Sequence, residues 1–167
     1  EKILENILNL DFNILETEKF FVQKINILGN NITRESVIRN QLEIDEGDPY
    51  NEILQVKSVN NIKSTNYFKK VDSKVYDGEL PNSKVIDIFI EEKATGEISA
   101  GAGAGTSGGT IAFAIKENNY LGKGISLETN ATLTDESIKG LFSVTNPNYK
   151  NSDKSLNPKK AGERSIP

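Results

Sequence analysis

The sequence predicts an α+β module of β-α-α-β-β order, followed by antiparallel β-strands of an incomplete transmembrane β-barrel. Before about residue 95, strand-type segments flank two helix signals; beyond it the helix signals end, and apolar residues alternate with polar or small ones. No apolar run approaches the ~20 residues that a membrane-spanning helix needs. A spanning strand needs only about 9–11 residues, of which alternate ones are apolar.

A repeated pattern sets the first module boundary. The stretches Leu10–Lys19 and Ile86–Thr95 are both apolar-acidic, and they carry acidic residues at matching positions. Similar segments at a fixed spacing indicate tandem modules, so residues 1–19 are expected to supply the C-terminal strand of a preceding module and residues 20–94 the next complete one. Two unrelated strands of similar composition remain the alternative. Because the chain begins at Glu1 without a signal peptide, we expect an internal or processed piece of a longer protein.

Local signals give the order of elements inside the complete module. Phe20–Asn30 is rich in β-branched residues and ends in a turn signal, which predicts a strand. Thr33 is the expected N-cap of a first helix, and Asp48 with Pro49 the expected start of a second, longer helix. Two strands separated by a turn are expected to complete the module, at about residues 67–76 and 84–92.

Four amphipathic strands are predicted after residue 95. Each carries one apolar and one polar or small face, and they run over about residues 97–105, 110–116, 125–133 and 138–145. A transmembrane barrel has this pattern, but so does a soluble antiparallel sheet with one buried face. Because the smallest barrels have ~8 strands, residues 95–150 are expected to hold only the first part of one. Residues 151–167 show no strand period and are expected to be a disordered tail.

The stretch GAGAGTSGG contains the spacing G-x-G-x-x-G at Gly103, Gly105 and Gly108. A dinucleotide-binding loop needs a helix after this motif, because the helix N-terminus holds the phosphates. The residues after Gly109 instead have the two-residue period of a strand. The glycines are therefore expected to lie on one face of a strand and in the hairpin turn after it, and a nucleotide-binding oxidoreductase remains a distant alternative.

Composition excludes several classes of function. A net charge of −4 and a pI of about 5.0 argue against nucleic acid as a partner, since phosphate binding needs a basic face. The absence of Cys and His removes thiol nucleophiles, Ser-His triads and most zinc sites. The acidic stretches Glu43–Asp48 and Glu91–Glu92 lack the register of a calcium loop, and we interpret them as helix caps and solvated charges. We predict a non-enzymatic protein with no cofactor and no metal site.

One strand of the module has a pattern typical of an exposed sheet edge. Lysines at positions 69, 70 and 74 lie within the stretch from Lys69 to Tyr76, and lysine on an edge strand discourages pairing with other chains. The same edge could accept an extended peptide as an added strand. Edge protection alone and binding of a client or partner are both open; the binding hypothesis assigns the contact to Lys69, Lys70, Val71, Asp72, Ser73, Lys74 and Val75.

Several motifs resemble the BamA family of outer-membrane protein assembly factors, in which periplasmic POTRA domains precede a β-barrel. VQKINILGNNITRESVIRNQLEIDEGDPYN resembles the opening of a POTRA domain, and YFKKVDSKV resembles the strand after its second helix. KENNYLGKG resembles the family's N-x-x-G-x-G turn after the second barrel strand, which assigns the barrel turn motif to Asn119, Gly122 and Gly124. FSVTNPNY resembles the family's V-T-N-P-Y stretch. The resemblance covers residues 1 to about 150 and ends at the tail.

The resemblance implies a function in the bacterial outer membrane, with the POTRA part in the periplasm. Such a protein binds unfolded outer-membrane proteins and catalyses their folding and insertion without ATP. The implied partners are these clients, accessory outer-membrane lipoproteins and outer-membrane lipid. A related POTRA-plus-barrel transporter, of two-partner secretion or TamA-like type, is the alternative, and a soluble periplasmic scaffold module is another.

The resemblance also places a seam of the barrel at the first predicted strand, where it would meet the last strand. The seam residues are Ile98, Gly101, Gly103 and Gly105. Glycine weakens strand pairing, because it loses more backbone entropy on ordering and packs no side chain. A glycine-rich strand therefore suits a seam that has to open.

Overall fold

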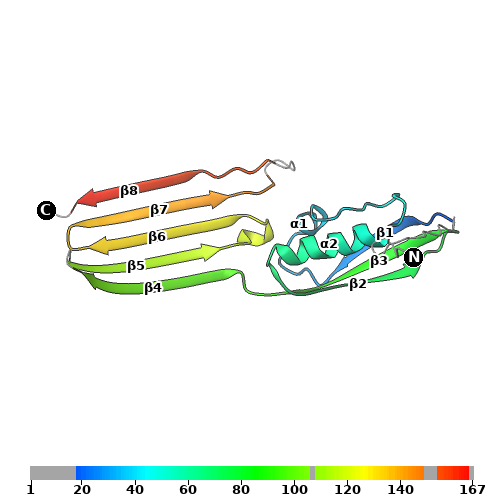
Figure 1. The fold of residues 1–167 in the computed structure, drawn as a ribbon, viewed down its shortest axis with the longest axis horizontal. Helices are drawn as coiled ribbons and strands as arrows, with labels where there is room; N and C mark the ends of the chain where they lie inside the picture. Colours follow the sequence, from blue (N-terminus) through cyan, green and yellow to red (C-terminus); the bar gives the residue numbers. More distant parts are fainter. Residues whose placement is uncertain (1–17, 106–107, 149–153, 166–167) are drawn as a thin grey trace, which may run out of the picture.

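The computed structural model describes residues 18–105, 108–148 and 154–165. Two β-sheets lie end to end along the long axis of the molecule (Figure 1). One has the strand order β1-β3-β2 and the other the order β4-β5-β6-β7-β8. The expected closing strand of a preceding module falls outside the described residues, apart from residues 18 and 19, which form no strand.

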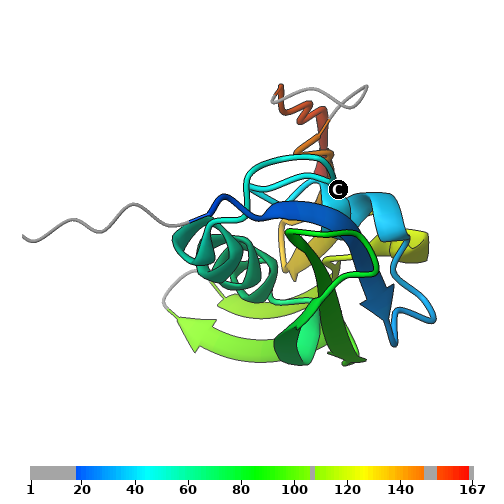
Figure 2. The same cartoon turned by 90° about the vertical axis from the view of Figure 1, so that its right-hand side faces the viewer.

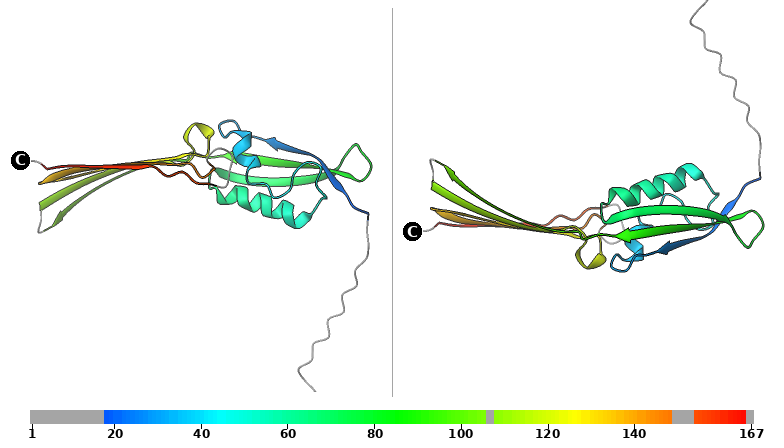
Figure 3. Two further views of the ribbon diagram at one scale, coloured as in Figure 1. Left: turned by 90° about the horizontal axis from the view of Figure 1, so that it is seen from above. Right: turned by 90° about the horizontal axis from the view of Figure 1, so that it is seen from below.

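The first sheet and its helices confirm the predicted β-α-α-β-β order. Strand β3 is central, because it pairs parallel with β1 and antiparallel with β2. Helix α2 runs along one face of this sheet (Figure 3). The elements are β1 (Phe21–Leu28), α1 (Glu35–Arg39), α2 (Glu52–Ser64), β2 (Phe68–Asp77) and β3 (Ser83–Glu92). We call this unit the module.

A β-bulge in β1 brings two of its apolar residues into the core. Strict alternation would place Val22 and Ile25 on opposite faces of the sheet, because they are three residues apart. The register of β1 against β3 shifts between Val22 and Lys24, which adds a residue and turns both side chains inward. Both are almost completely buried. The rest of the buried core is Ile38, Ile44, Val59, Ile62, Phe68, Val71, Ile86, Ile88 and Ile90.

Helix α2 begins later than the sequence predicts. Its N-cap is Asn51, whose side-chain oxygen accepts hydrogen bonds from the backbone N–H of Ile53 at 2.9 Å and of Leu54 at 3.3 Å. The predicted cap, Asp48, is engaged elsewhere, because its carboxylate accepts from the backbone N–H of Asp45 at 2.9 Å. An Asn at the N-cap position satisfies two helix N–H groups that would otherwise have no partner, so the helix starts there.

The predicted cap of the first helix is also wrong. Arg34 occupies the N-cap position of α1 and makes no side-chain cap hydrogen bond. Thr33 is buried instead, and its hydroxyl accepts a hydrogen bond from Asn119, which lies between β5 and β6 of the second sheet. The Thr33 side chain, which local spacing assigns to the helix cap, therefore bonds to a residue far along the chain.

The second sheet contains the four expected strands and one more. Its elements are β4 (Gly96–Gly105), β5 (Gly108–Glu117), the 3₁₀ helix η1 (Tyr120–Gly122), β6 (Ser126–Thr134), β7 (Ser137–Thr145) and β8 (Lys159–Ser165). All neighbouring strands pair antiparallel. We call this unit the open sheet, because β4 and β8 each have a free edge among the described residues.

Strand β8 corrects the expectation of a disordered tail after residue 151. It pairs with β7 from Ser137–Ser165 to Ser143–Lys159, and the Lys139 ammonium lies 3.0 Å from the Glu163 carboxylate. The tail carries no alternating pattern because both of its faces are charged or small. Backbone pairing to an existing edge and a cross-strand ion pair form the strand without a hydrophobic face.

The register of the open sheet sorts its residues onto two faces. Ile98, Ile115 and Phe142 share one face, because Ile98 pairs with Ile115, which pairs with Thr129, which pairs with Phe142. Further large apolar residues on this face are Ile111, Phe113, Leu133 and Ile138, and all seven are exposed. Burying such a side chain fully is worth about 1.5–3 kcal/mol, so this face leaves a stabilisation on the order of 5 kcal/mol or more unrealised in water. No described element covers the face.

Packing of α2 gives a test of the module's core. Ile62 is 0% exposed, so Ile62→Ala is expected to lower the free energy of unfolding by about 2–5 kcal/mol through lost burial and a cavity. Ile53 lies in the same helix but is 77% exposed, so Ile53→Ala should change it by less than about 0.5 kcal/mol. Urea unfolding of residues 18–95, followed by circular dichroism, measures both. Equal losses in the two variants would contradict this packing.

Candidate functional sites at the junction and the sheet edges

The turn between β5 and β6 joins the open sheet to the module. Asn119 is buried there, and its side-chain N–H donates to the Thr33 hydroxyl at 2.8 Å. Its side-chain oxygen accepts from the backbone N–H of Gly124 at 2.8 Å. One amide thus closes the turn and ties it to the loop before α1. An uncompensated buried amide would cost about 1–3 kcal/mol, so both bonds matter to the junction.

Two glycines let this turn approach the module. The Gly122 carbonyl accepts from the backbone N–H of Arg34 at 2.9 Å, and a side chain at Gly122 would overlap the carbonyl oxygen of Ile32. Gly122 and Gly124 both have φ of +67°, a conformation that favours glycine. Figures 2 and 3 accordingly show η1 beside α1. The three residues that the sequence predicts as a barrel turn motif therefore form one contact site.

Glu92 holds the module's side of this junction. Its carboxylate accepts hydrogen bonds from three successive backbone N–H groups, those of Asn31 at 3.0 Å, Ile32 at 2.8 Å and Thr33 at 2.6 Å. Partial burial alone would raise the pKa of Glu92, but the bonds from Thr33, Ile32 and Asn31 outweigh it and leave the pKa lowered. Sequence reasoning missed this role and assigned Glu92 to solvated charge, because no local spacing relates it to residues 31–33.

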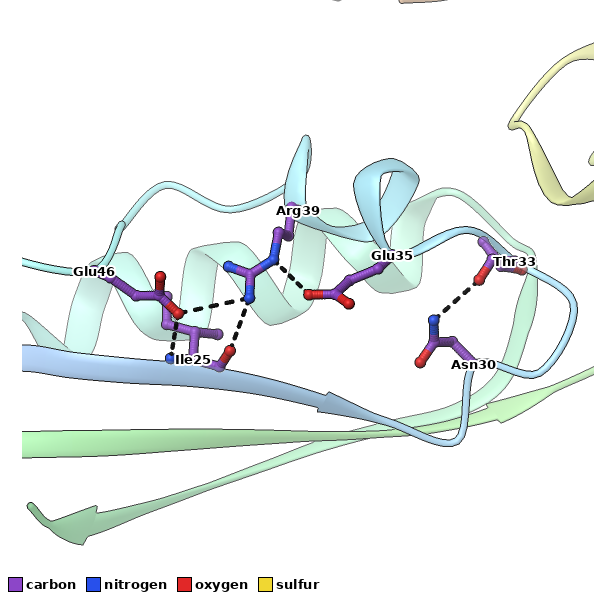
Figure 4. Close-up of polar contacts among 6 residues, drawn as sticks. All are labelled: Ile25, Asn30, Thr33, Glu35, Arg39 and Glu46. Atoms are coloured by element: carbon purple, nitrogen blue, oxygen red, sulfur yellow. Dashed lines mark hydrogen bonds and ion pairs between the residues drawn. The ribbon is translucent and has the colours of Figure 1, made fainter.

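A second polar network fastens α1 to β1 (Figure 4). The Arg39 guanidinium donates to Glu35 at 2.7 Å and to the Ile25 carbonyl at 3.0 Å, and lies 3.5 Å from Glu46. Glu46 in turn accepts from the backbone N–H of Ile25 at 2.9 Å. The hydrogen bond to Glu35 is the main cause of a raised pKa of Arg39; burial opposes it and Glu46 adds to it. Figure 4 also shows Asn30 donating to the Thr33 carbonyl at 3.1 Å.

Strand β2 lies at one edge of the module's sheet, as the lysine pattern predicts. Val71 is buried and Val75 half-buried, while Ser73 accepts a hydrogen bond from Gln55 of α2 at 2.7 Å. The charged residues lie outside, and their side chains contact either a neighbour in β2 or a residue of β3. Lys69 contacts Glu91 at 2.6 Å, Lys70 contacts Asp72 at 2.6 Å, and the Lys74 ammonium lies 5.7 Å from the centroid of the Phe89 ring.

Strand β4 lies at one edge of the open sheet. Unlike β2, it has few charged or large side chains that would discourage pairing with another strand. Ile98 is 81% exposed and faces the apolar side of the open sheet. Gly101, Gly103 and Gly105 lie on the other side, and a side-chain carbon built on any of them would have no atom within 4 Å. The four predicted seam residues therefore belong to one edge strand that pairs only with β5 among the described residues.

The spacing of Gly103, Gly105 and Gly108 does not form a phosphate-binding loop. Strand β5 begins at Gly108, so a strand follows the motif and no helix N-terminus faces it. Residues 106 and 107 lie outside the described part. Among the described residues, a strand stands where the oxidoreductase alternative requires a helix.

Two further findings apply to residues 18–105, 108–148 and 154–165. No group of three or more His, Cys, Asp or Glu side chains there could hold a metal ion. No helix in that part of the chain has the length and apolar character needed to cross a membrane.

Comparisons with known proteins match this architecture. Residues 20–93 fit the POTRA family model, described as surface antigen variable number repeat. The chain is 24% identical over 153 residues to the outer membrane protein assembly factor BamA of Nitratidesulfovibrio vulgaris, covering 91% of this chain and 19% of that protein. It is 32% identical over 129 residues to BamA of Buchnera aphidicola, covering 75% of this chain and 21% of that protein. The chain thus spans about a fifth of the length of these relatives.

A solved structure agrees over both units. BamA from Haemophilus ducreyi lacking POTRA domains 1–3 superposes with a TM-score of 0.77 and 26% identity, covering 86% of this chain and 27% of that one. The match extends across the module and the open sheet. The chain is therefore a BamA-like segment, made of a POTRA domain and a set of antiparallel strands that match part of the BamA barrel.

The hydrogen bonds to Glu92 predict a pH dependence at the junction. Because its pKa is lowered in the folded state, the contribution of Glu92 to stability is present above the ordinary glutamate pKa and lost as pH falls through the lowered value. Hydrogen-exchange protection of the Asn31, Ile32 and Thr33 amides is expected at about pH 6 and should fall as the pH is lowered below the ordinary glutamate pKa of about 4.3. Glu92→Gln should reduce this protection already at about pH 6, because the charge-assisted bonds are lost, and should remove most of its pH dependence.

Glu91→Gln is the matched control for this measurement. Glu91 precedes Glu92 in β3, but its carboxylate is exposed and contacts Lys69. Protection of the three amides should therefore be unchanged in this variant. If Glu92→Gln protected them as well as the unaltered protein at about pH 6, the assignment of Glu92 to the junction would be wrong.

Proposed function

We propose that this BamA-like chain is part of an outer-membrane assembly factor that receives unfolded β-barrel proteins and promotes their folding and insertion into the bacterial outer membrane. The POTRA domain would lie in the periplasm and the open sheet in the membrane. The named function of the relatives, outer membrane protein assembly, supports this proposal. The observation that carries it is an amphipathic open sheet whose apolar face and weak first edge are both uncovered.

The apolar face supports placement in lipid. Its isoleucine, leucine and phenylalanine side chains are exposed across four neighbouring strands. The opposite face carries Ser99, Asn130, Thr132 and Lys139, as the lumen side of a barrel does. Strands β4 and β5 have 10 residues each and β6 and β7 have 9, lengths that suit a tilted spanning strand.

The free edge of β4 supports a role in templating. An edge strand presents unpaired backbone N–H and C=O groups, and an incoming strand can hydrogen-bond to them. No nucleotide is available in the periplasm to drive this step, so backbone pairing would supply the free energy. Glycine makes the resident pairing at this edge weak, which allows exchange between the barrel's own last strand and a client strand.

The edge of β2 is our proposed contact for clients or accessory lipoproteins. Its charged side chains pair with one another or with β3 and leave the strand itself uncovered. An extended segment could add to this edge and place its side chains beside Lys70, Asp72 and Lys74.

Stiffening the seam tests the main proposal. Replacing Gly101, Gly103 and Gly105 by Val in a full-length protein is expected to impair client assembly at least ~10-fold, because valine strengthens strand pairing and fixes the seam. The open space around these positions means that the substitutions create no clash in this chain. The rate at which a client barrel becomes protease-resistant in vesicles measures the effect.

Valines in the next strand provide the matched control. Thr110, Ala112 and Ala114 lie on the same face of β5, opposite Gly103, Gly101 and Ser99, and β5 is paired on both sides. Thr110→Val, Ala112→Val and Ala114→Val together should leave assembly within about two-fold, because no seam has to open there. Normal client assembly in the variant that replaces the three glycines of β4 by valine would contradict the seam proposal.

Photo-crosslinking tests the β2 edge separately. A photoreactive residue in place of Lys70 or Lys74 is expected to crosslink to an unfolded client or an accessory lipoprotein in living cells. The same residue in place of Lys24, which is exposed on β1 at the opposite edge of the sheet, serves as the control. Equal crosslinking from Lys24, or none from β2, would count against the β2 edge as a binding site.

A further inference from the structure

A cleft of about 510 Å³ lies where the POTRA helices meet the open sheet. Arg34 and Lys123 contribute its two charged side chains, and no described Asp or Glu lines it. The cleft is therefore positively charged, whereas the chain as a whole has a net charge of −4. Amide and hydroxyl side chains also line the cleft, among them Ser36, Asn40, Gln41, Asn61, Ser64 and Thr65.

The junction brings the two cations together. The backbone N–H of Arg34 donates to the Gly122 carbonyl at 2.9 Å, and Lys123 is the next residue after Gly122. Gly124, the residue after Lys123, closes the turn through its hydrogen bond to Asn119. The POTRA loop and the barrel turn therefore fix Arg34 and Lys123 on one rim, although they are far apart in sequence.

Neither cation is neutralised by the described part of the chain. The ion pairs of that part do not include Arg34 or Lys123. Two like charges in one concave site focus a positive potential and favour an anion. Guanidinium and ammonium groups together are well suited to a phosphate, since Arg offers a bidentate donor pair and Lys a point charge.

A second polar feature lines the same cleft. Among the described residues, Oδ1 of Asn148 is the buried side-chain oxygen that has no hydrogen-bond partner. Buried polar atoms are nearly always hydrogen-bonded, so this oxygen calls for a donor. A hydroxyl group on the bound molecule would provide one. Val37, Tyr67, Ile125 and Pro147 add an apolar part to the lining.

We propose that this cleft binds the phosphate-bearing, hydroxylated headgroup of an anionic phospholipid. Arg34 and Lys123 hold the phosphate, the amide-rich wall and Asn148 receive the hydroxyl groups, and the apolar residues contact the glycerol backbone. The choice of a lipid over a soluble phosphate rests on the proposed function. The cleft lies at the end of β6 and β7 that adjoins the POTRA domain, which in that placement is the level of the periplasmic leaflet.

The test uses a full-length protein in maltoside micelles, which contain no phosphate. Dihexanoyl phosphatidylglycerol is titrated by calorimetry and compared with dihexanoyl phosphatidylcholine and with inorganic phosphate. We expect saturable binding of the phosphatidylglycerol, at least ~10-fold tighter than either comparison ligand. Arg34→Gln with Lys123→Gln should weaken it at least ~10-fold, because two charge-assisted contacts are lost.

Two variants separate specific binding from a change of net charge or of folding. Lys24→Gln with Lys63→Gln removes the same charge, and neither residue lines the cleft, so affinity should hold. Arg34→Lys with Lys123→Arg keeps both charges and should retain most of the binding. Equal binding of inorganic phosphate, or equal losses in the two Gln pairs, would overturn the proposal. Because the assay contains no client protein, its result is independent of the seam experiment.

Discussion

The buried amide of Asn119 holds the two units of this chain in one arrangement. It joins the β5–β6 turn to Thr33 and closes that turn at the same time. Thr33 is fixed in its place by Glu92, the last residue of β3. Residues 93–95 connect β3 covalently to β4. The hydrogen bonds that join Glu92 to Thr33 and Thr33 to Asn119 begin next to this connection, so the two units are joined twice in one region. The open sheet therefore leaves the POTRA domain in a defined direction.

This arrangement leaves two free strand edges that are protected by different means. Strand β2 carries lysines that pair with Asp72 of the same strand and with Glu91 of β3. Strand β4 has Glu97 as its sole charged residue and relies on glycine and alanine. In water a charged edge resists unwanted pairing, whereas in a bilayer a charge costs about 2–4 kcal/mol near the midplane. An edge inside the membrane has to be weakened in another way, and glycine does so.

The sequence predicts the periodic parts of the structure well, because their pattern depends on neighbouring residues alone. The order of elements in the module and the alternation of β4 to β7 follow from apolar spacing. The parts that it misses depend on partners far along the chain. Local spacing assigns Thr33 to a helix cap, but its hydroxyl accepts a hydrogen bond from the distant Asn119. Glu92 likewise has no nearby signal for its three N–H donors. The bulge that buries both Val22 and Ile25 depends on the register of β3.

Strand β8 pairs with its neighbour although its residues do not alternate between apolar and polar. Its backbone completes the hydrogen bonding of β7, and Glu163 reaches Lys139 on the polar face. On the other face, Lys160 lies opposite Phe142 and Arg164 opposite Ile138. Those positions continue the apolar face of β4 to β7 with positive charge, which a lipid-facing strand does not tolerate without cost. The amphipathic surface therefore ends at β7, and β8 satisfies the backbone of that strand without extending the face that would contact lipid.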